Sequence, residues 1–220
     1  MRHGLPAAAW AGLTAVMTVV FCGTATADSP LVPQGQINAI ILSSHDVGGI
    51  VGATLDRANT SIVPYRPADL GNKSECNLLL GLDTSTVSDD YETFKTASYN
   101  DGDDKGANIS HIVTEDAAIY PDTDTPAKLF HDDLRSLNGC DTVHVNDDNS
   151  DWQIQSPRVS GNHALWTTTQ LANGKSFGWR CSFDLRAVSN VFLQAEVCQY
   201  GNPIRTVALV ADRMAAAASS

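Results

Sequence analysis

The segment Ser43-Ser44-His45-Asp46 contains the three residue types of a hydrolytic triad. A triad requires these side chains to meet in a defined geometry, and neighbours along one segment do not assemble it. The Gly-x-Ser-x-Gly turn that presents a nucleophilic serine in many hydrolases does not occur in the sequence. Ser44 and Asp46 are instead typical of the start of a helix. We therefore predict no catalytic residues and no enzymatic activity.

A second candidate for chemistry is the acidic run that begins at Asp147, which starts like a calcium-binding loop. Trp152 occupies the position where such a loop needs glycine, and Arg158 occupies the position of the bidentate glutamate. We predict a solvated turn there. The histidines are scattered along the chain, so we predict no metal site and no cofactor; they include His111, His131, His144 and His163.

The candidate binding residues alternate along one predicted strand. Arg180, Asp184 and Arg186 fall on the face opposite Phe183, because side chains alternate between the two faces of a strand. Such a row is either a solvated sheet face or the floor of a cleft, in which two arginines hold an anionic or polar ligand. Trp166 could add an aromatic wall. The predicted ligand-binding residues are thus Arg180, Asp184, Arg186 and Trp166, for an unknown small polar ligand or envelope component.

The elements that position this row centre on two cysteines. Cys181 and Cys198 each lie in a run of strand-forming residues, and the midpoint between them, Ser189-Asn190, suits a tight turn. A hairpin with this turn places the two sulfurs opposite each other, at a separation that suits a disulfide. A disulfide of this kind indicates an oxidising compartment.

The register that pairs these cysteines creates a conflict. It also pairs Phe183 with Glu196 and Leu185 with Gln194, so the apolar faces of the two strands point in opposite directions. Either a bulge shifts the register by one residue, or both faces of the sheet are covered. We expect the bulge.

Residues 1–27 have the form of a signal peptide. Arg2 gives a positive start, an uncharged apolar run extends from Leu5 to Phe21, and Ala25-Thr26-Ala27 is a small-x-small cleavage site. The apolar run is short for a membrane span, which needs about 20 residues. We expect cleavage before Asp28 and a secreted domain of residues 28–220 without a stable membrane span. A retained anchor and a lipid on Cys22 are the alternatives.

One of the five cysteines, Cys22, leaves with this leader, and the remaining four predict two disulfides in an exported chain. Because the hairpin pairs Cys181 with Cys198, the second disulfide is Cys76–Cys140. The sequence has no Cys-x-x-Cys pair, which argues against zinc. The formal net charge of −11 argues against nucleic acid or an anionic lipid surface as the principal partner.

The pattern of apolar residues predicts helices first and strands later. The predicted helices are Ile37–Ile41, Ser44–Gly52, Cys76–Leu82, Ala127–Gly139 and Val207–Met214. The predicted strands are Ile109–Tyr120, Thr142–Val145, Trp152–Gln155, Ala164–Thr169, Trp179–Leu185 and Val191–Val197. Residues 59–73 are loop-like, and Tyr91–Tyr99 mixes helix and strand signals. The fold class is therefore α+β, a twisted antiparallel sheet with packed helices and two disulfides.

Several sequence blocks occur in an order that resembles a known family. They are Ile37–Ser43 followed by Asp46-Val47, Cys76 with Tyr91, Ala127–Phe130 leading to Cys140, Gly178–Cys181, Asn190–Phe192 leading to Cys198, and Val210–Met214. Over about residues 33–215 the chain resembles the extracellular sensor domain of the mycobacterial PknH-type serine/threonine kinases and its standalone secreted relatives.

The resemblance implies an extracytoplasmic domain with two disulfides and a twisted sheet that forms one wall of a cleft. The motifs of the kinase half are missing from the sequence, so signalling would need a separate partner. We expect a secreted or cell-envelope ligand-binding or sensor domain without catalytic activity. An envelope hydrolase with an unrecognised site and a structural, partner-binding envelope protein are the alternatives.

Overall fold

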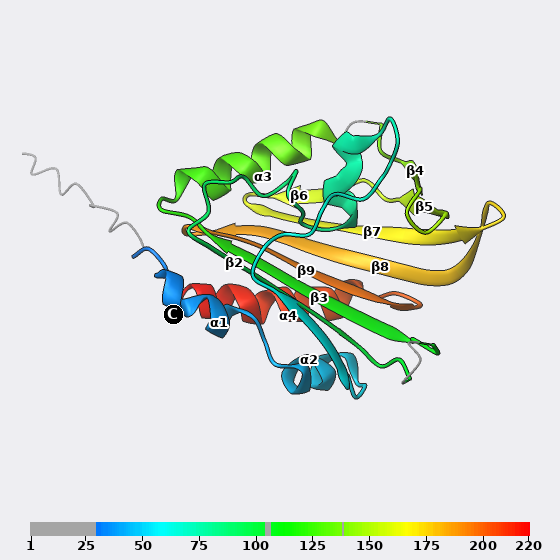
Figure 1. Ribbon diagram of the computed structural model, residues 1–220, viewed down its shortest axis with the longest axis horizontal. Helices are drawn as coiled ribbons and strands as arrows, with labels where there is room; N and C mark the ends of the chain where they lie inside the picture. Colours follow the sequence, from blue (N-terminus) through cyan, green and yellow to red (C-terminus); the bar gives the residue numbers. More distant parts are fainter. Residues whose placement is uncertain (1–29, 104–106, 138) are drawn as a thin grey trace, which may run out of the picture.

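A nine-stranded antiparallel sheet with helices on both faces forms the protein (Figure 1). This computed structural model describes residues 30–103, 107–137 and 139–220. The signal peptide predicted for residues 1–27 lies outside the described residues. In the described part of the chain, no helix combines the length and the hydrophobicity needed to cross a membrane.

The strands follow the order β1-β2-β3-β9-β8-β7-β5-β4 across the sheet, and β6 also pairs with β7. The C-terminal strands form the predicted meander, and β9 returns to the centre of the sheet to pair with β3. The bounds are β1 Arg57–Ser61, β2 Thr93–Asn100, β3 His111–Ile119, β4 Thr142–Val145, β5 Ser150–Ile154, β6 Arg158–Ser160, β7 His163–Ala172, β8 Lys175–Val188 and β9 Val191–Tyr200.

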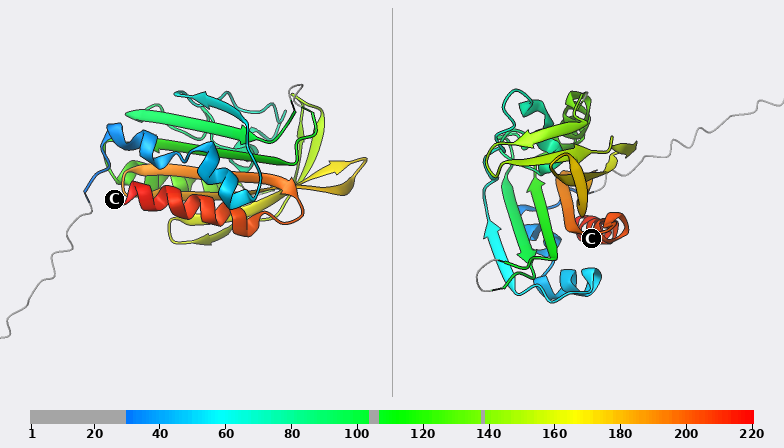
Figure 2. Two further views of the ribbon diagram at one scale, coloured as in Figure 1. Left: turned by 90° about the horizontal axis from the view of Figure 1, so that it is seen from below. Right: turned by 90° about the vertical axis from the view of Figure 1, so that its right-hand side faces the viewer.

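The helices divide between the two faces of the sheet. Two α-helices, α1 (Ile37–Ile40) and α2 (Ser44–Val51), share one face with α4 (Ile204–Ala218), as Figure 2 shows on its left. The other face is covered by α3 (Asp124–Ser136) and the 3₁₀ helix η2 (Ser74–Leu80). A further 3₁₀ turn, η1 (Gln34–Gln36), precedes α1. We call these the α4 face and the α3 face; each buries its own apolar cluster.

The hairpin of β8 and β9 keeps the register that pairs Cys181 with Cys198, and Phe183 lies opposite Glu196. Its turn is Ser189-Asn190, with Ser189 at a positive φ of 51°. The expected bulge between these strands is therefore wrong. Both faces of the sheet are covered instead, so each strand can direct apolar residues to either side.

The turn residue Asn190 is also a buried anchor. Its amide oxygen accepts a hydrogen bond from the backbone N–H of Val32 at 2.8 Å. Its amide nitrogen donates to the carbonyl oxygens of Val32 and Tyr120 at 3.1 and 2.6 Å. These bonds fix the start of the described chain to the end of the central hairpin.

The segment with the three triad residue types forms the start of α2. Ser43, rather than Ser44 as predicted, is the residue that caps the helix: its Oγ accepts from the backbone N–H of Asp46 at 3.2 Å and donates to the Asp46 carboxylate at 2.6 Å. His45 points to solvent, with 98% of its side chain exposed. Gly52 ends the helix in the left-handed region, as expected, with φ of 77°.

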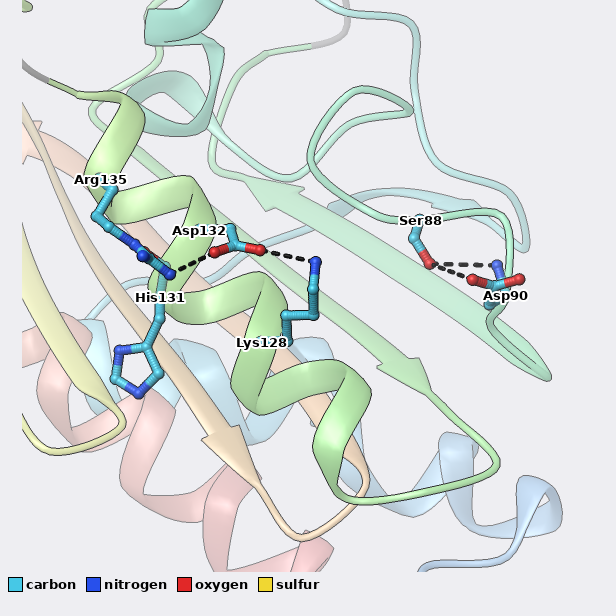
Figure 3. Close-up of polar contacts among 6 residues, drawn as sticks. All are labelled: Ser88, Asp90, Lys128, His131, Asp132 and Arg135. Atoms are coloured by element: carbon cyan, nitrogen blue, oxygen red, sulfur yellow. Dashed lines mark hydrogen bonds and ion pairs between the residues drawn. The ribbon is translucent and has the colours of Figure 1, made fainter.

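The outer surface of α3 carries a short chain of ion pairs (Figure 3). Asp132 accepts from Lys128 at 2.8 Å, one turn earlier in the helix, and also from Arg135. The hydrogen bond from Lys128 lowers the pKa of Asp132. Figure 3 also shows the nearby turn in which Ser88 Oγ accepts from the Asp90 backbone N–H at 3.3 Å. Exposed pairs of this kind contribute little stability, so α3 is held mainly by its buried side, where Phe130 lies in the core.

Both predicted disulfides are confirmed. Cys76–Cys140 connects η2 to the segment after α3, across 64 residues of sequence. Cys181–Cys198 connects β8 to β9, across 17 residues. The first therefore closes the longer loop and fastens the cover of the α3 face, whereas the second fixes the register of the central hairpin.

We expect removal of the long disulfide by Cys76→Ala with Cys140→Ala to destabilise the protein by about 4 kcal/mol, because it releases the larger unfolded loop. The matched double variant at Cys181 and Cys198 should lose about 3 kcal/mol. Chemical denaturation of both variants and of the wild type measures this. An equal stability of wild type and the Cys76/Cys140 variant would contradict the prediction.

Candidate functional site

Two adjoining cavities hollow the α3 face, with volumes of about 320 and 410 Å³. Both are lined by Leu80 of η2 and Glu196 of β9, so they form one cleft with two compartments. The acidic compartment is the smaller one and is lined by Asn59, Tyr65, Arg66, Asn77, Asp83, Ser98, Thr114, Asp116 and Glu196, among others. The apolar compartment is lined mainly by Leu80, Ile112, Val145, Trp152, Trp179, Phe183 and the Cys181–Cys198 disulfide.

The sheet positions the floor of the acidic compartment. Ser98 of β2, Thr114 of β3 and Glu196 of β9 are successive cross-strand partners, so their side chains lie in a row on the α3 face. Thr114 Oγ1 donates to Ser98 Oγ at 3.3 Å. Asp116 lies two residues further along β3, on the same face, opposite Gln194. The floor is therefore polar although the strands around it are strongly apolar.

Two carboxyl groups of this floor hold protons more tightly than usual. Burial raises the pKa of Asp116 to about 7. Burial, together with the charge of Asp116, raises the pKa of Glu196 to about 8. Glu196 Oε1 lies 3.1 Å from Cys198 Sγ. Because this sulfur is in a disulfide and has no proton to donate, the contact suits the protonated carboxyl of Glu196.

The segment 66–69, at the rim of the acidic compartment, is held by Asp147, which lies far away in the sequence. Arg66 donates to Asp147 at 2.7 Å, and the same carboxylate accepts from the backbone N–H of Asp69 at 2.9 Å. These bonds lower the pKa of Asp147, the one from Asp69 most. The acidic run that resembled a calcium loop thus binds the segment 66–69 to the turn before β5.

The apolar compartment offers two half-buried tryptophans. Trp152 donates from Nε1 to Ser150 Oγ at 2.8 Å, which fixes its ring. Trp179 packs edge-to-face against Tyr200, with ring centroids 5.2 Å apart. Their exposed ring surfaces give the compartment its aromatic character.

The four residues predicted to bind ligand lie on two different faces. Trp166 is buried on the α3 face, where it stacks on Phe183 at 5.3 Å and donates from Nε1 to the Leu79 carbonyl at 3.2 Å. Asp184 and Arg186 lie on the α4 face, because they alternate with Phe183 along β8. Arg180, on that same side, is exposed. Trp166 therefore cannot form a wall for the arginine row.

Asp184 and Arg186, two of the predicted ligand-binding residues, bind each other and hold α4 against the sheet. The Asp184 side chain is fully buried and accepts from Arg186 Nε and Nη2 at 2.8 and 2.9 Å. Arg186 also contacts Asp212 of α4 at 2.8 Å, and His163 Nε2 lies 3.0 Å from Asp184. The hydrogen bonds to Asp184 raise the pKa of Arg186. This pair is already satisfied within the protein, so its geometry supports packing.

The cleft residues were missed from the sequence, although one signal was present. Asp116 and Glu196 are acids inside predicted strands, Ile109–Tyr120 and Val191–Val197, which also contribute many apolar residues to the core. An acid at such a position is either paired in the core or exposed to a cavity. Asn77 and Asp83, which line the same compartment, come from a segment for which the sequence predicted at most a short helix.

An extracytoplasmic α+β domain with two disulfides and a cleft on one sheet face is the class of protein that these features define. The family described as the PknH-like extracellular domain matches residues 32–217, and this chain belongs to that family. The family resemblance, the fold class and the extracytoplasmic location expected from the sequence are thereby confirmed.

The fold is similar to a solved structure, the crystal structure of the extracellular domain of PknH from Mycobacterium tuberculosis. The TM-score is 0.72 at 17% sequence identity, over 86% of this chain and 98% of the PknH chain. A search of curated protein sequences gave no match.

Replacement of Arg186 should destabilise the protein. Arg186→Ala leaves the buried Asp184 carboxylate without its main partner, so we expect a loss of about 3 to 5 kcal/mol in the free energy of unfolding. The exposed Arg180 provides the matched control, and Arg180→Ala should change stability by less than about 1 kcal/mol. Urea denaturation of the two variants compares them; equal losses would rule out the structural role assigned to Arg186.

The raised pKa of Asp116 predicts a pH-dependent stability. A carboxyl whose folded pKa exceeds its unfolded value stabilises the fold at low pH, and this contribution is lost as pH rises from about 4 through 7. In Asp116→Asn this loss is removed. Between pH 5 and pH 8, the free energy of unfolding of the variant relative to that of wild type should therefore rise by about 2 kcal/mol. Denaturation at both pH values tests this, with Asp89→Asn, an exposed acid outside the cleft, expected to follow wild type.

Proposed function

We propose that this chain is a ligand-binding sensor domain of the cell envelope, without catalytic activity, and that its ligand occupies the cleft on the α3 face. The observation that carries this proposal is a polar group in the cleft that the fold leaves unused. Asn77 is only 4% exposed, lines the acidic compartment, and its Oδ1 has no hydrogen-bond partner among the described residues. An unpaired buried acceptor costs stability, and a bound ligand would offset that cost.

The cleft is a better candidate than the row of Arg180, Asp184 and Arg186. Asp184 and Arg186 bind each other and α4, whereas the acids of the cleft face open space. The size of the two compartments suits a small molecule.

The setting of this function follows the family. We propose residues 1–27 as a signal peptide and residues 28–220 as the exported domain, in a mycobacterial envelope like that of the structurally similar PknH domain. Binding without turnover is what a sensor domain requires, and a separate partner protein would then relay the bound state.

A block of the cleft tests the proposal. Thr114→Trp places a large ring on the floor of the acidic compartment, and Gln199→Trp places the same ring on the opposite face of the sheet. In a thermal-shift screen of peptidoglycan fragments and small-molecule envelope extracts, wild type and Gln199→Trp should be stabilised by the same samples. Thr114→Trp should lose these shifts.

Two outcomes would contradict the proposal. Identical shifts in Thr114→Trp and wild type would remove the cleft as the binding site. Steady consumption of a bound fragment, followed by mass spectrometry, would show an enzyme rather than a sensor.

A further inference from the structure

We propose that the ligand of the cleft is a small organic amine. Its ammonium group would lie among Asn77, Asp116 and Glu196, and its apolar body would lie against Trp152 and Trp179. This inference rests on the proposed function and specifies the chemical class of the ligand.

The acidic compartment offers one buried acceptor without a donor, on Asn77, and two carboxyl groups, Asp116 and Glu196, that have threonine hydroxyls but no cation beside them among the described residues. The free group of Asn77 is its amide oxygen, which only accepts. Asp116 and Glu196 take part in no ion pair within the described residues, although both line the cavity. An ammonium carries three donors and a positive charge, so one such group can satisfy all three side chains.

The surrounding charges favour the same sign of ligand. Asp83 is buried beside the compartment, where its carboxylate accepts from Ser85 and Thr86. The cation at the rim, Arg66, is bound to Asp147 and has 79% of its side chain exposed. The acids of the floor thus lack a neutralising partner from this side, and once ionised they repel an anionic ligand.

The neighbouring compartment gives the ligand its second half. It adjoins the acidic compartment at Leu80 and Glu196 and presents Trp152 and Trp179. An apolar body placed there is removed from water, which favours binding. The tryptophan rings also favour a nearby cation. A bare metal ion or a polyanion would use neither feature.

Proton exchange should accompany binding. Asp116 and Glu196 have pKa values of about 7 and 8, so the empty cleft holds protons near neutral pH. An amine with a pKa near 10, as in lysine, stays charged and displaces those protons. The other charged or titratable groups that line the site are the buried Asp83, together with Arg66 and Tyr65, in the acidic compartment and Asp148 in the apolar compartment. Affinity should therefore rise as pH increases from 6 to 8.

Three probes of matched shape test the class of ligand: 2-phenylethylamine, 2-phenylethanol and 3-phenylpropionate. Titration calorimetry on the wild-type chain should detect the amine at pH 8, weaker binding of the alcohol, and none of the carboxylate. The amine should bind at least about tenfold more weakly at pH 6 and in Asp116→Asn/Glu196→Gln, because each loses the charge partner. Asp89→Asn, an exposed acid outside the cleft, should bind like wild type.

A second variant keeps the test decisive if the double variant misfolds. Trp152→Ala leaves both acids in place, and we expect it to weaken 2-phenylethylamine binding while leaving methylamine binding unchanged. If Trp152→Ala binds 2-phenylethylamine as tightly as wild type does, the placement of the apolar body is overturned.

The outcomes separate this inference from the proposed function. Preference for 3-phenylpropionate or 2-phenylethanol, abolished by Thr114→Trp, would overturn the amine and support the cleft. Amine binding that is equal in wild type and Asp116→Asn/Glu196→Gln would also overturn it. Amine binding that survives Thr114→Trp would overturn both proposals.

Discussion

The pairing of Cys181 with Cys198 is the constraint on which the rest of the structure depends. A disulfide between directly opposed strand residues allows no slip of β8 against β9, so it decides the face to which every side chain of the hairpin points. Phe183 and Glu196 must then share the α3 face, while Asp184 and Ala195 share the α4 face. Acids lie on both faces of the sheet. Covering each face therefore buries at least one carboxyl group, whose charge must be paired, neutralised or left beside a cavity.

The protein solves that problem in three ways. Asp184 is paired with Arg186. Arg186 also forms an ion pair with Asp212 of α4, so these contacts hold α4 against the sheet. Glu115, also on the α4 face, has its pKa raised to about 9 by burial, so it is neutral at pH 7. Asp116 and Glu196 border open space on the α3 face instead. Buried acids with a cavity beside them are candidates for function, whereas paired ones are explained by packing.

The predicted elements succeeded where apolar residues mark a strand or helix and failed where they do not. Thr142–Val145 matches β4, and the turn at Ser189-Asn190 was placed from the cysteine spacing and from the turn-forming residues at its midpoint. β1, Arg57–Ser61, is a polar edge strand. It is a strand because it pairs with β2, and its own sequence carries no strand signal. The sequence left two explanations for the opposed apolar faces, a bulge or coverage of both faces, and the bulge was preferred. A second covering layer is a tertiary property that one hairpin cannot reveal.

The cleft was harder to predict than the fold because its residues come from separate segments that only the sheet order brings together. Asp116 and Glu196 come close through the pairing of β3 with β9, which the predicted meander of consecutive strands did not imply. The 3₁₀ helix η2, which covers this face, adds Asn77. The similarity to the PknH domain, at 17% identity, shows a common fold and does not extend to the side chains of the cleft. Asp116 and Glu196 give this cleft its acidic character while their strands keep their pairing in the sheet. A fold does not determine function, so the proposed ligand class follows from the acids of this chain and not from the similar fold.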